Sequence, residues 1–270
     1  MLFRRDGDGV IAIPQPSHAW LSGQMLRAWG NGTFPAPAPR EETCLGAELH
    51  DIGWLGWEAS PTLNPGTGLP HAFQELGPER HIAIWGEGVG RALAFGRYPA
   101  LLVSLHADTI YGAYFDFEKA APEDAALVRR FLDGQHRFQR DCIAALAGNP
   151  RYAAELTPEA LERNRLLIAA VDRMSLVICW GIRGEARIPD VPCDSGRREE
   201  LRIRSPRGEP AELTVDPWPF AAGRVELVCE GRRLRGRFED EAAMRAALEQ
   251  AAPLSLAATL VPAAPVEPSR

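Results

Sequence analysis

The order of helical and strand periodicity along the chain is the feature that most constrains its fold. Apolar side chains recur with helical spacing through most of residues 14–181, whereas residues 200–238 alternate β-forming side chains between proline and glycine breaks. The first thirteen residues read as two short strands around Asp6-Gly7-Asp8-Gly9, which suits a tight hairpin. Because a lone hairpin is marginal in water, we expect it to join the C-terminal strands in one sheet.

These patterns predict a mainly α (α+β) protein with three parts. Residues 14–190 are expected to form a helical domain, and residues 1–13 with 197–252 a small β-rich subdomain holding an antiparallel sheet. Residues 253–270 are rich in alanine and proline, so we expect a loosely held tail. Within the helical domain, one helix begins at Pro14 and a second ends near His50-Asp51. The remaining predicted helices lie at about 78–95, 98–115, 122–147 and 157–181.

The composition limits the partners and the location of the protein. Its formal charge is -6 without a block of like charge, which argues against a nucleic-acid partner. No stretch approaches the roughly 18 apolar residues of a membrane span, and no apolar signal segment follows the charged start. The five cysteines lack C-x-x-C spacing, which fits a reducing cytoplasm. We therefore expect a cytoplasmic protein with a small-molecule substrate and no membrane partner, and a homo-oligomer remains open.

Polar side chains that can bind a metal lie on or beside the apolar faces of four predicted helices. They are His18, His50, Asp51, His106 and Asp172. Asp172 shares its helix face with Ile168 and Leu176, and an unpaired carboxylate there would cost several kcal/mol. It therefore needs a cationic partner, which is either a buried arginine or a metal ion. Taken alone, His106 fits a hydrogen-bonded core histidine better than a ligand.

Taken together, the five side chains favour a metal site, because packed helices bring their apolar faces to a common core. Imidazole and carboxylate ligands without thiolates suit Fe, Mn, Zn or Ni and leave room for a catalytic coordination sphere. We predict one or two such divalent ions. Glu58 and Asp108 flank the set and are candidates to orient its histidines. His136 has polar neighbours and is expected to be solvated.

The spacing of His18, His50-Asp51 and Asp172 is similar to the H…HD…D pattern of the HD-domain superfamily of metal-dependent phosphohydrolases. The stretch "HDIG" at 50–53 resembles the form found in cyclic-dinucleotide phosphodiesterases of that superfamily, although their additional G-Y-P signature is absent. Over most of the chain, a closer resemblance is to a bacterial family known as domain of unknown function 3891. The segments that carry it are "AIPQPSHAWLSGQMLRAWG", "LHDIGW", "LLVSLHADTIYG" and "VDRMSLVICW".

The superfamily resemblance implies an HD-like helical bundle over 14–190, in which His18, His50, Asp51 and Asp172 hold one metal. Asp51 would bridge to a second ion and, with His106, take part in catalysis. His106 would also be a metal ligand, joined by His71 or His81. The implied reaction is hydrolysis of a phosphoester or nucleotide by a metal-activated water. Two alternatives remain open: an HD-type di-iron oxygenase, and a non-catalytic binding or regulatory module with a structural His/Asp cluster.

Overall fold

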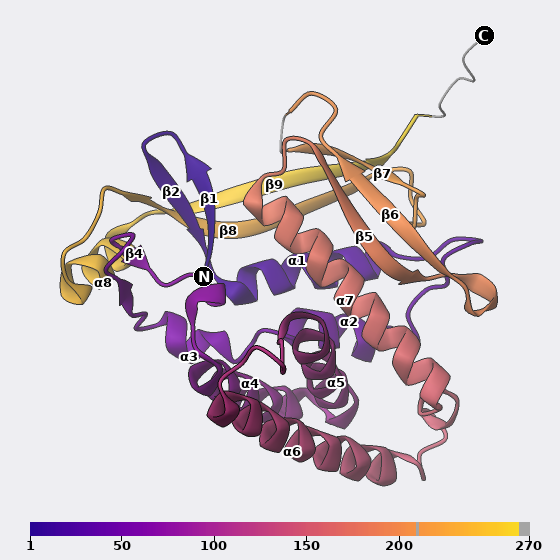
Figure 1. The fold of residues 1–270 in the computed structure, drawn as a ribbon. Helices are drawn as coiled ribbons and strands as arrows, with labels where there is room; N and C mark the ends of the chain where they lie inside the picture. Colours follow the sequence, from indigo (N-terminus) through magenta and orange to yellow (C-terminus); the bar gives the residue numbers. More distant parts are fainter. Residues whose placement is uncertain (209–210, 265–270) are drawn as a thin grey trace.

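A curled sheet of seven strands covers one side of a group of helices (Figure 1). The computed structural model describes residues 1–208 and 211–264. The strands are β1 (Leu2–Asp6), β2 (Gly9–Ile13), β5 (Glu185–Pro192), β6 (Arg198–Arg204), β7 (Glu212–Asp216), β8 (Val225–Arg235) and β9 (Pro253–Pro262). Their order across the sheet is β1-β2-β8-β9-β7-β6-β5. A separate pair, β3 (Leu63–Asn64) and β4 (Leu69–Pro70), lies in the loop after the third helix.

The helices match the predicted periodicity closely. They are α1 (Gln15–Ala28), α2 (Arg40–Leu49), α3 (Trp54–Glu58), α4 (Pro78–Ala92), α5 (Arg97–Tyr114), α6 (Pro122–Leu146), α7 (Pro158–Trp180) and α8 (Glu241–Gln250). Helix α7 shows why its bounds could be read from the sequence. The Thr157 hydroxyl accepts a hydrogen bond from the Ala160 backbone N–H at its start, and Gly181 ends it with a φ of 72°.

The N-terminal hairpin joins the C-terminal strands, as predicted. Strand β2 pairs antiparallel with β8, with Gly9 opposite Arg235 and Ala12 opposite Arg232. Arg4 on β1 also donates hydrogen bonds to the backbone oxygens of Ile178 and Cys179 near the end of α7. The hairpin therefore connects the sheet to the last long helix.

The predicted HD-like helical bundle with a small antiparallel sheet is wrong. The sheet is large, and it is mixed, because β7 and β9 run parallel while the other neighbouring pairs are antiparallel. The fold is therefore α+β, and the sheet shares the main hydrophobic core with the helices. Buried side chains of α1, α7, β6 and β9 belong to one hydrophobic cluster, among them Met25, Ile168, Leu201 and Leu260.

The interpretation of residues 253–270 as a tail is also corrected by the structure. Residues 253–262 form β9, which lies between β8 and β7 in the middle of the sheet, while 265–270 fall outside the described residues. Ala258 and Leu260 are buried against the helices, whereas Ala257 on the opposite face is exposed. Alanine and proline content was a poor guide here, because a strand with one buried face needs apolar side chains only at alternate positions.

One of the glycines between 200 and 238, Gly231 after Glu230, does not separate two strands, although the sequence pattern predicts a break there. Strand β8 runs unbroken from 225 to 235. A Cβ atom at Gly231 would lie 2.7 Å from the Cγ2 atom of Ile11 and 3.1 Å from the Ala12 oxygen. The glycine is therefore needed for the close approach of β2 and not for a turn.

Helices α1 and α7 lie between the sheet and the other helices (Figure 1). Helix α1 contacts β8 on one side and α2 on the other, and α7 contacts β5 and α5. His18 on α1 and Asp172 on α7 are both buried at this interface. The fold thus places two of the predicted ligands near the centre of the protein.

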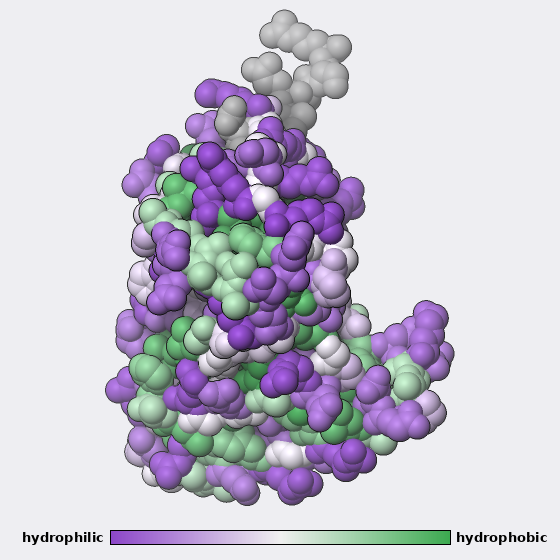
Figure 2. All heavy atoms as spheres, turned by 90° about the vertical axis from the view of Figure 1, so that its left-hand side faces the viewer, coloured by the Kyte–Doolittle hydropathy of each residue, from purple (hydrophilic) through white to green (hydrophobic). Residues whose placement is uncertain are grey.

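The outer surface mixes hydrophilic and hydrophobic areas, as Figure 2 shows for one face. Among the residues that the structure describes, no helix has the length and apolar character needed to cross a membrane. The large hydrophobic side chains that are exposed are Trp20, Leu55, Leu93, Phe95, Tyr114, Trp180 and Val228. Two of these, Tyr114 and Trp180, line the cavity described below.

The central position of β9 leads to a stability prediction. Leu260→Ala should lower the free energy of unfolding by about 2–5 kcal/mol, because it leaves a void in the shared core. Val228→Ala on the neighbouring strand is the control, since Val228 is exposed and its truncation should cost less than about 0.5 kcal/mol. Urea denaturation of both variants measures the difference. Equal costs would contradict the assignment of β9 to the core.

Candidate metal centre

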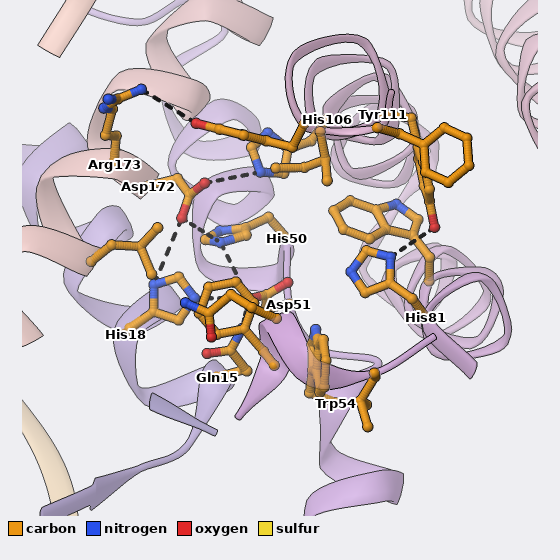
Figure 3. Close-up of a pocket in the computed structure, with 18 of the residues that line it drawn as sticks. Gln15, His18, His50, Asp51, Trp54, His81, His106, Tyr111, Asp172 and Arg173 are labelled. Carbon is orange, nitrogen blue, oxygen red and sulfur yellow. Dashed lines mark hydrogen bonds and ion pairs between the residues drawn. The ribbon is translucent and has the colours of Figure 1, made fainter. Parts of the chain in front are cut away.

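The five predicted ligands lie together in one buried cluster (Figure 3). His18 comes from α1, His106 from α5 and Asp172 from α7, while His50 and Asp51 directly follow α2. The His50 ring centroid is 5.0 Å from that of His18 and 5.0 Å from that of His106. The structure therefore brings together residues that are separated by as many as 154 positions, given by 172 − 18.

The turn that carries His50-Asp51 is held in place by its packing on α4. A Cβ atom at Gly53 would lie 2.0 Å from the backbone oxygen of Ile84 and 2.8 Å from the Gly88 nitrogen. The glycine of "HDIG" is therefore required for close contact between this turn and α4. This contact fixes the two ligand residues at the point where α2 ends.

The hydrogen-bond partners of His18 determine that its Nδ1 carries a proton. Its Nδ1 lies 2.7 Å from the Ser175 hydroxyl oxygen, and that hydroxyl donates its own proton to the Asp172 backbone oxygen at 2.7 Å. The hydroxyl must therefore accept from the His18 Nδ1–H. In neutral His18, the lone pair of Nε2 then faces Asp51 Oδ2 at 2.7 Å. Two acceptors at this distance repel unless a cation lies between them.

His50 shows the same arrangement. Its Nδ1–H donates to the Ala47 backbone oxygen at 2.7 Å. Its Nε2 lies 3.4 Å from Asp172 Oδ1 and 3.7 Å from Asp51 Oδ2, and it makes no hydrogen bond to any described residue. Metal-binding histidines commonly donate their second N–H to a carbonyl in this way and leave the other nitrogen free for the ion.

The titratable groups of the cluster shift one another's pKa values. Burial disfavours the imidazolium, but the charges of Asp51 and Asp172 outweigh burial and raise the pKa of His50 to about 9. Burial opposes ionisation of Asp172 too, yet the neighbouring His106 and His50 rings hold its pKa well below the usual value. Two ionised carboxylates therefore share a buried site that a proton or a metal ion must neutralise.

The carboxylate of Asp172 contacts histidines and not an arginine. Its oxygens lie 3.3 Å from His106 Nε2, 3.4 Å from His50 Nε2 and 3.8 Å from His18 Nδ1. Within the described ranges, no arginine forms an ion pair with this carboxylate. The buried-arginine alternative for Asp172 is therefore wrong.

The ligand atoms form two overlapping sets that share His50. One set is His18, His50 and Asp51, and the other is His50, His106 and Asp172; within each, one ligand atom per residue lies within 4.8 Å of the others. Burial lowers the pKa of His106, with Asp172 opposing, so its ring is neutral near pH 7 and its Nδ1 is without a partner in the described chain. These donors fit one or two transition-metal ions.

A cavity of about 700 Å³ opens beside the cluster and has all five ligand residues in its wall. Most of the remaining wall is apolar or aromatic, including Trp54, Phe73, Trp85, Tyr111, Phe115 and Trp180. This volume is in the range of small-molecule sites. A ligand in the cavity would therefore contact the cluster directly.

The two candidates for a further histidine ligand lie in different places. His71 does not reach the cluster, since its Nδ1 lies 2.9 Å from the Thr62 hydroxyl oxygen and its side chain is outside the cavity wall. His81 does line the cavity, with its Nδ1 2.7 Å from the Tyr111 hydroxyl. His81 is not part of either ligand set.

The flanking acids do not contact the ligand histidines. Glu58 accepts a hydrogen bond from the Gln15 backbone N–H at 3.0 Å and contacts the Met1 ammonium group, and Asp108 pairs with His136 at 2.8 Å. His136 is exposed, as predicted. The structure therefore does not support the predicted role of Glu58 and Asp108 as orienting partners of the predicted ligand histidines.

Two residues that the sequence pattern did not single out orient the predicted ligands. Gln15 donates from Nε2 to Asp51 Oδ2 at 3.1 Å, and Ser175 accepts from His18. Gln15 precedes His18 by three positions, and Ser175 follows Asp172 by three, so each shares a helix face with a ligand. That spacing was the available signal, but polar residues at helical spacing are too common to be singled out by it.

The fold and the cluster define an α+β protein with a buried His/Asp site beside a small-molecule cavity. The chain matches the family model described as "Protein of unknown function (DUF3891)" over residues 1–236, and it belongs to that family. The matched region contains all five cluster residues and ends just after β8. No curated protein and no solved structure matches the chain.

Proposed function

We propose that this protein is a metal-dependent phosphohydrolase. The proposal rests on the orientation of two histidine rings. His18 Nε2 and His50 Nε2 both face carboxylate oxygens, while the second nitrogen of each ring is committed to a hydrogen bond. The order of these ligands along the chain is similar to the H…HD…D pattern of HD-superfamily phosphohydrolases, which supports hydrolysis as the reaction.

In this proposal, His18, His50, Asp51 and Asp172 hold one ion, and His106 adds a ligand when a second is bound. A divalent transition metal would supply Lewis acidity that lowers the pKa of a water and stabilises charge on phosphoryl oxygens. Gln15 fixes Asp51, and Ser175 fixes the tautomer of His18. Proton transfer would involve Asp51 and, where only one ion is bound, the neutral His106 ring, whose Nε2 would then be free to accept a proton from the attacking water.

One observation favours a second candidate, an oxygenase with two iron ions. The cavity wall is largely apolar, and the two overlapping ligand sets can accommodate two ions. An apolar wall suits oxidation of a hydrophobic substrate as well as binding of the organic part of a phosphoester. Iron content and oxygen consumption distinguish this candidate from the hydrolase. A non-catalytic binding or regulatory module, the third candidate, would bind metal or ligand and show neither activity.

The test begins with elemental analysis of protein purified without added metal, followed by hydrolysis assays on a panel of phosphoesters. We expect one or two transition-metal ions per chain and hydrolysis that a chelator abolishes. His18→Gln should lose most of the metal and of the activity, whereas His136→Gln, which changes an exposed histidine, should lose neither. Wild-type protein that binds none of Fe, Mn, Zn or Ni after reconstitution would overturn the proposal.

A further inference from the structure

One side of the cavity is an aromatic surface beside the His/Asp cluster. The His81 ring centroid lies 5.8 Å from the Trp54 ring, 5.6 Å from the Trp85 ring and 5.6 Å from the Tyr111 ring. Figure 3 shows Trp54, His81 and Tyr111 on the same side of the cluster. Such a surface binds a flat apolar ring by stacking or edge contacts.

The cavity wall also contains a cationic side chain that is free to bind an anion. Arg173 donates from Nη1 to the Tyr114 hydroxyl at 3.3 Å, and within residues 1–208 and 211–264 it forms no ion pair with a carboxylate. The other arginine of the wall, Arg187, lies 3.4 Å from both Glu185 and Glu200. In Figure 3, Arg173 is on the opposite side of the cluster from Trp54, His81 and Tyr111.

We propose that the substrate is a phosphoester of an aromatic alcohol or another ring-bearing group of similar size. The phosphoryl group would lie between the metal cluster and Arg173, and the ring would contact Trp54, His81 and Tyr111. This inference rests on the proposed hydrolase function and names its substrate class. It disfavours sugar phosphates, because most of the wall that a sugar ring would contact is apolar or aromatic.

The charge of the site also argues against polyphosphate substrates. With one divalent ion bound, its charge and those of the two carboxylates sum to zero, so each added phosphoryl group needs another cation nearby. Arg173 is the one arginine of the described cavity wall that is not paired with a carboxylate, and the wall contains no lysine. With one metal ion bound, the cavity wall can therefore neutralise the charge of a single phosphoryl group.

Two probes with the same anionic group test this inference by binding, independently of turnover. Phenylphosphonate and methylphosphonate are titrated into the metal-loaded protein by calorimetry, and the metal content of each sample is measured. Phenylphosphonate should bind at least about tenfold more tightly, because its ring buries apolar surface against the aromatic wall. Arg173→Gln should weaken both probes by about tenfold, since both lose one charged hydrogen-bond donor.

Arg130→Gln is the matched control, because Arg130 is an exposed helical arginine outside the cavity wall, and it should leave both affinities unchanged. Equal affinities of the two phosphonates for metal-loaded protein would overturn the substrate class and leave the hydrolase proposal intact. Unchanged affinities in Arg173→Gln would overturn the role of Arg173. Absence of metal from the reconstituted protein would instead overturn the proposed function itself.

Discussion

Asp172→Asn should bind metal at least about a hundredfold more weakly than the wild type and lose nearly all of the proposed phosphoesterase activity. The substitution keeps the shape of the side chain but removes one of the two buried negative charges that face His18, His50 and His106. Loss of an outer partner of a metal ligand already costs roughly 10–100-fold in affinity, and loss of a charged ligand should cost more. Metal titration monitored by calorimetry, together with elemental analysis, measures the effect.

Asp108→Asn is the matched control for this variant. Asp108 also pairs with a histidine, but that histidine is the exposed His136 and the pair is outside the cavity wall. Its amide variant should keep the full metal content. If Asp172 serves only to stabilise the fold, the opposite result follows: Asp172→Asn would retain its metal and melt at a much lower temperature. That outcome would remove Asp172 from the ligand set.

Most helices could be predicted because each carries its own local signals. Helix α7, for example, has a threonine cap at its start, a glycine at its end and an apolar face between them. Pairing between distant strands leaves weaker signals. Strand β5 contains Pro189 and lies at the edge of the sheet, where a missing N–H is tolerated, so its sequence reads as a loop.

Strand β9 did carry a signal that its composition obscured. In "PLSLAATLVP", the side chains of Leu254, Leu256, Ala258 and Leu260 alternate with smaller or polar ones, which is strand periodicity. Its place between β8 and β7 could not be read from this pattern, because register and neighbours are decided by packing between distant segments.

The convergence of the five cluster side chains could be predicted because a charged or imidazole side chain on an apolar helix face is costly without a partner. Asp172 is the clearest example, since its neighbours at helical spacing are buried. The tautomers of His18 and His50 could not be predicted, because they depend on Ser175 and on the Ala47 carbonyl. The aromatic side of the cavity could not be predicted either, because its residues come from three helices, α3, α4 and α5.

The second large effect concerns pH. Metal-free protein should lose up to about 3 kcal/mol of stability between pH 6.5 and pH 9, because the pKa of His50 is raised from 6.5 to about 9 by Asp51 and Asp172 against the effect of burial. A raised folded-state pKa means that the folded protein holds this proton more tightly than the unfolded chain does. The resulting stabilisation is complete below pH 6.5 and disappears as the pH rises through 9.

Asp172 and His106 titrate outside this window. Burial alone would raise the pKa of Asp172, but the neighbouring His106 and His50 rings hold it well below the usual value, and burial lowers the pKa of His106. Their contributions therefore change only as the pH falls below the usual values of a carboxyl or an imidazole. A bound metal takes the place of the His50 proton, so the metal-loaded protein should show little loss over the same range, and metal affinity should rise with pH. His50→Gln, which has no titrating group there, supplies the baseline. Urea unfolding of the chelator-treated wild type and of His50→Gln at pH 6 and pH 9.5 measures how the free energy of unfolding of each protein changes with pH. If both proteins change equally, His50 Nε2 does not carry the proton that a metal would replace.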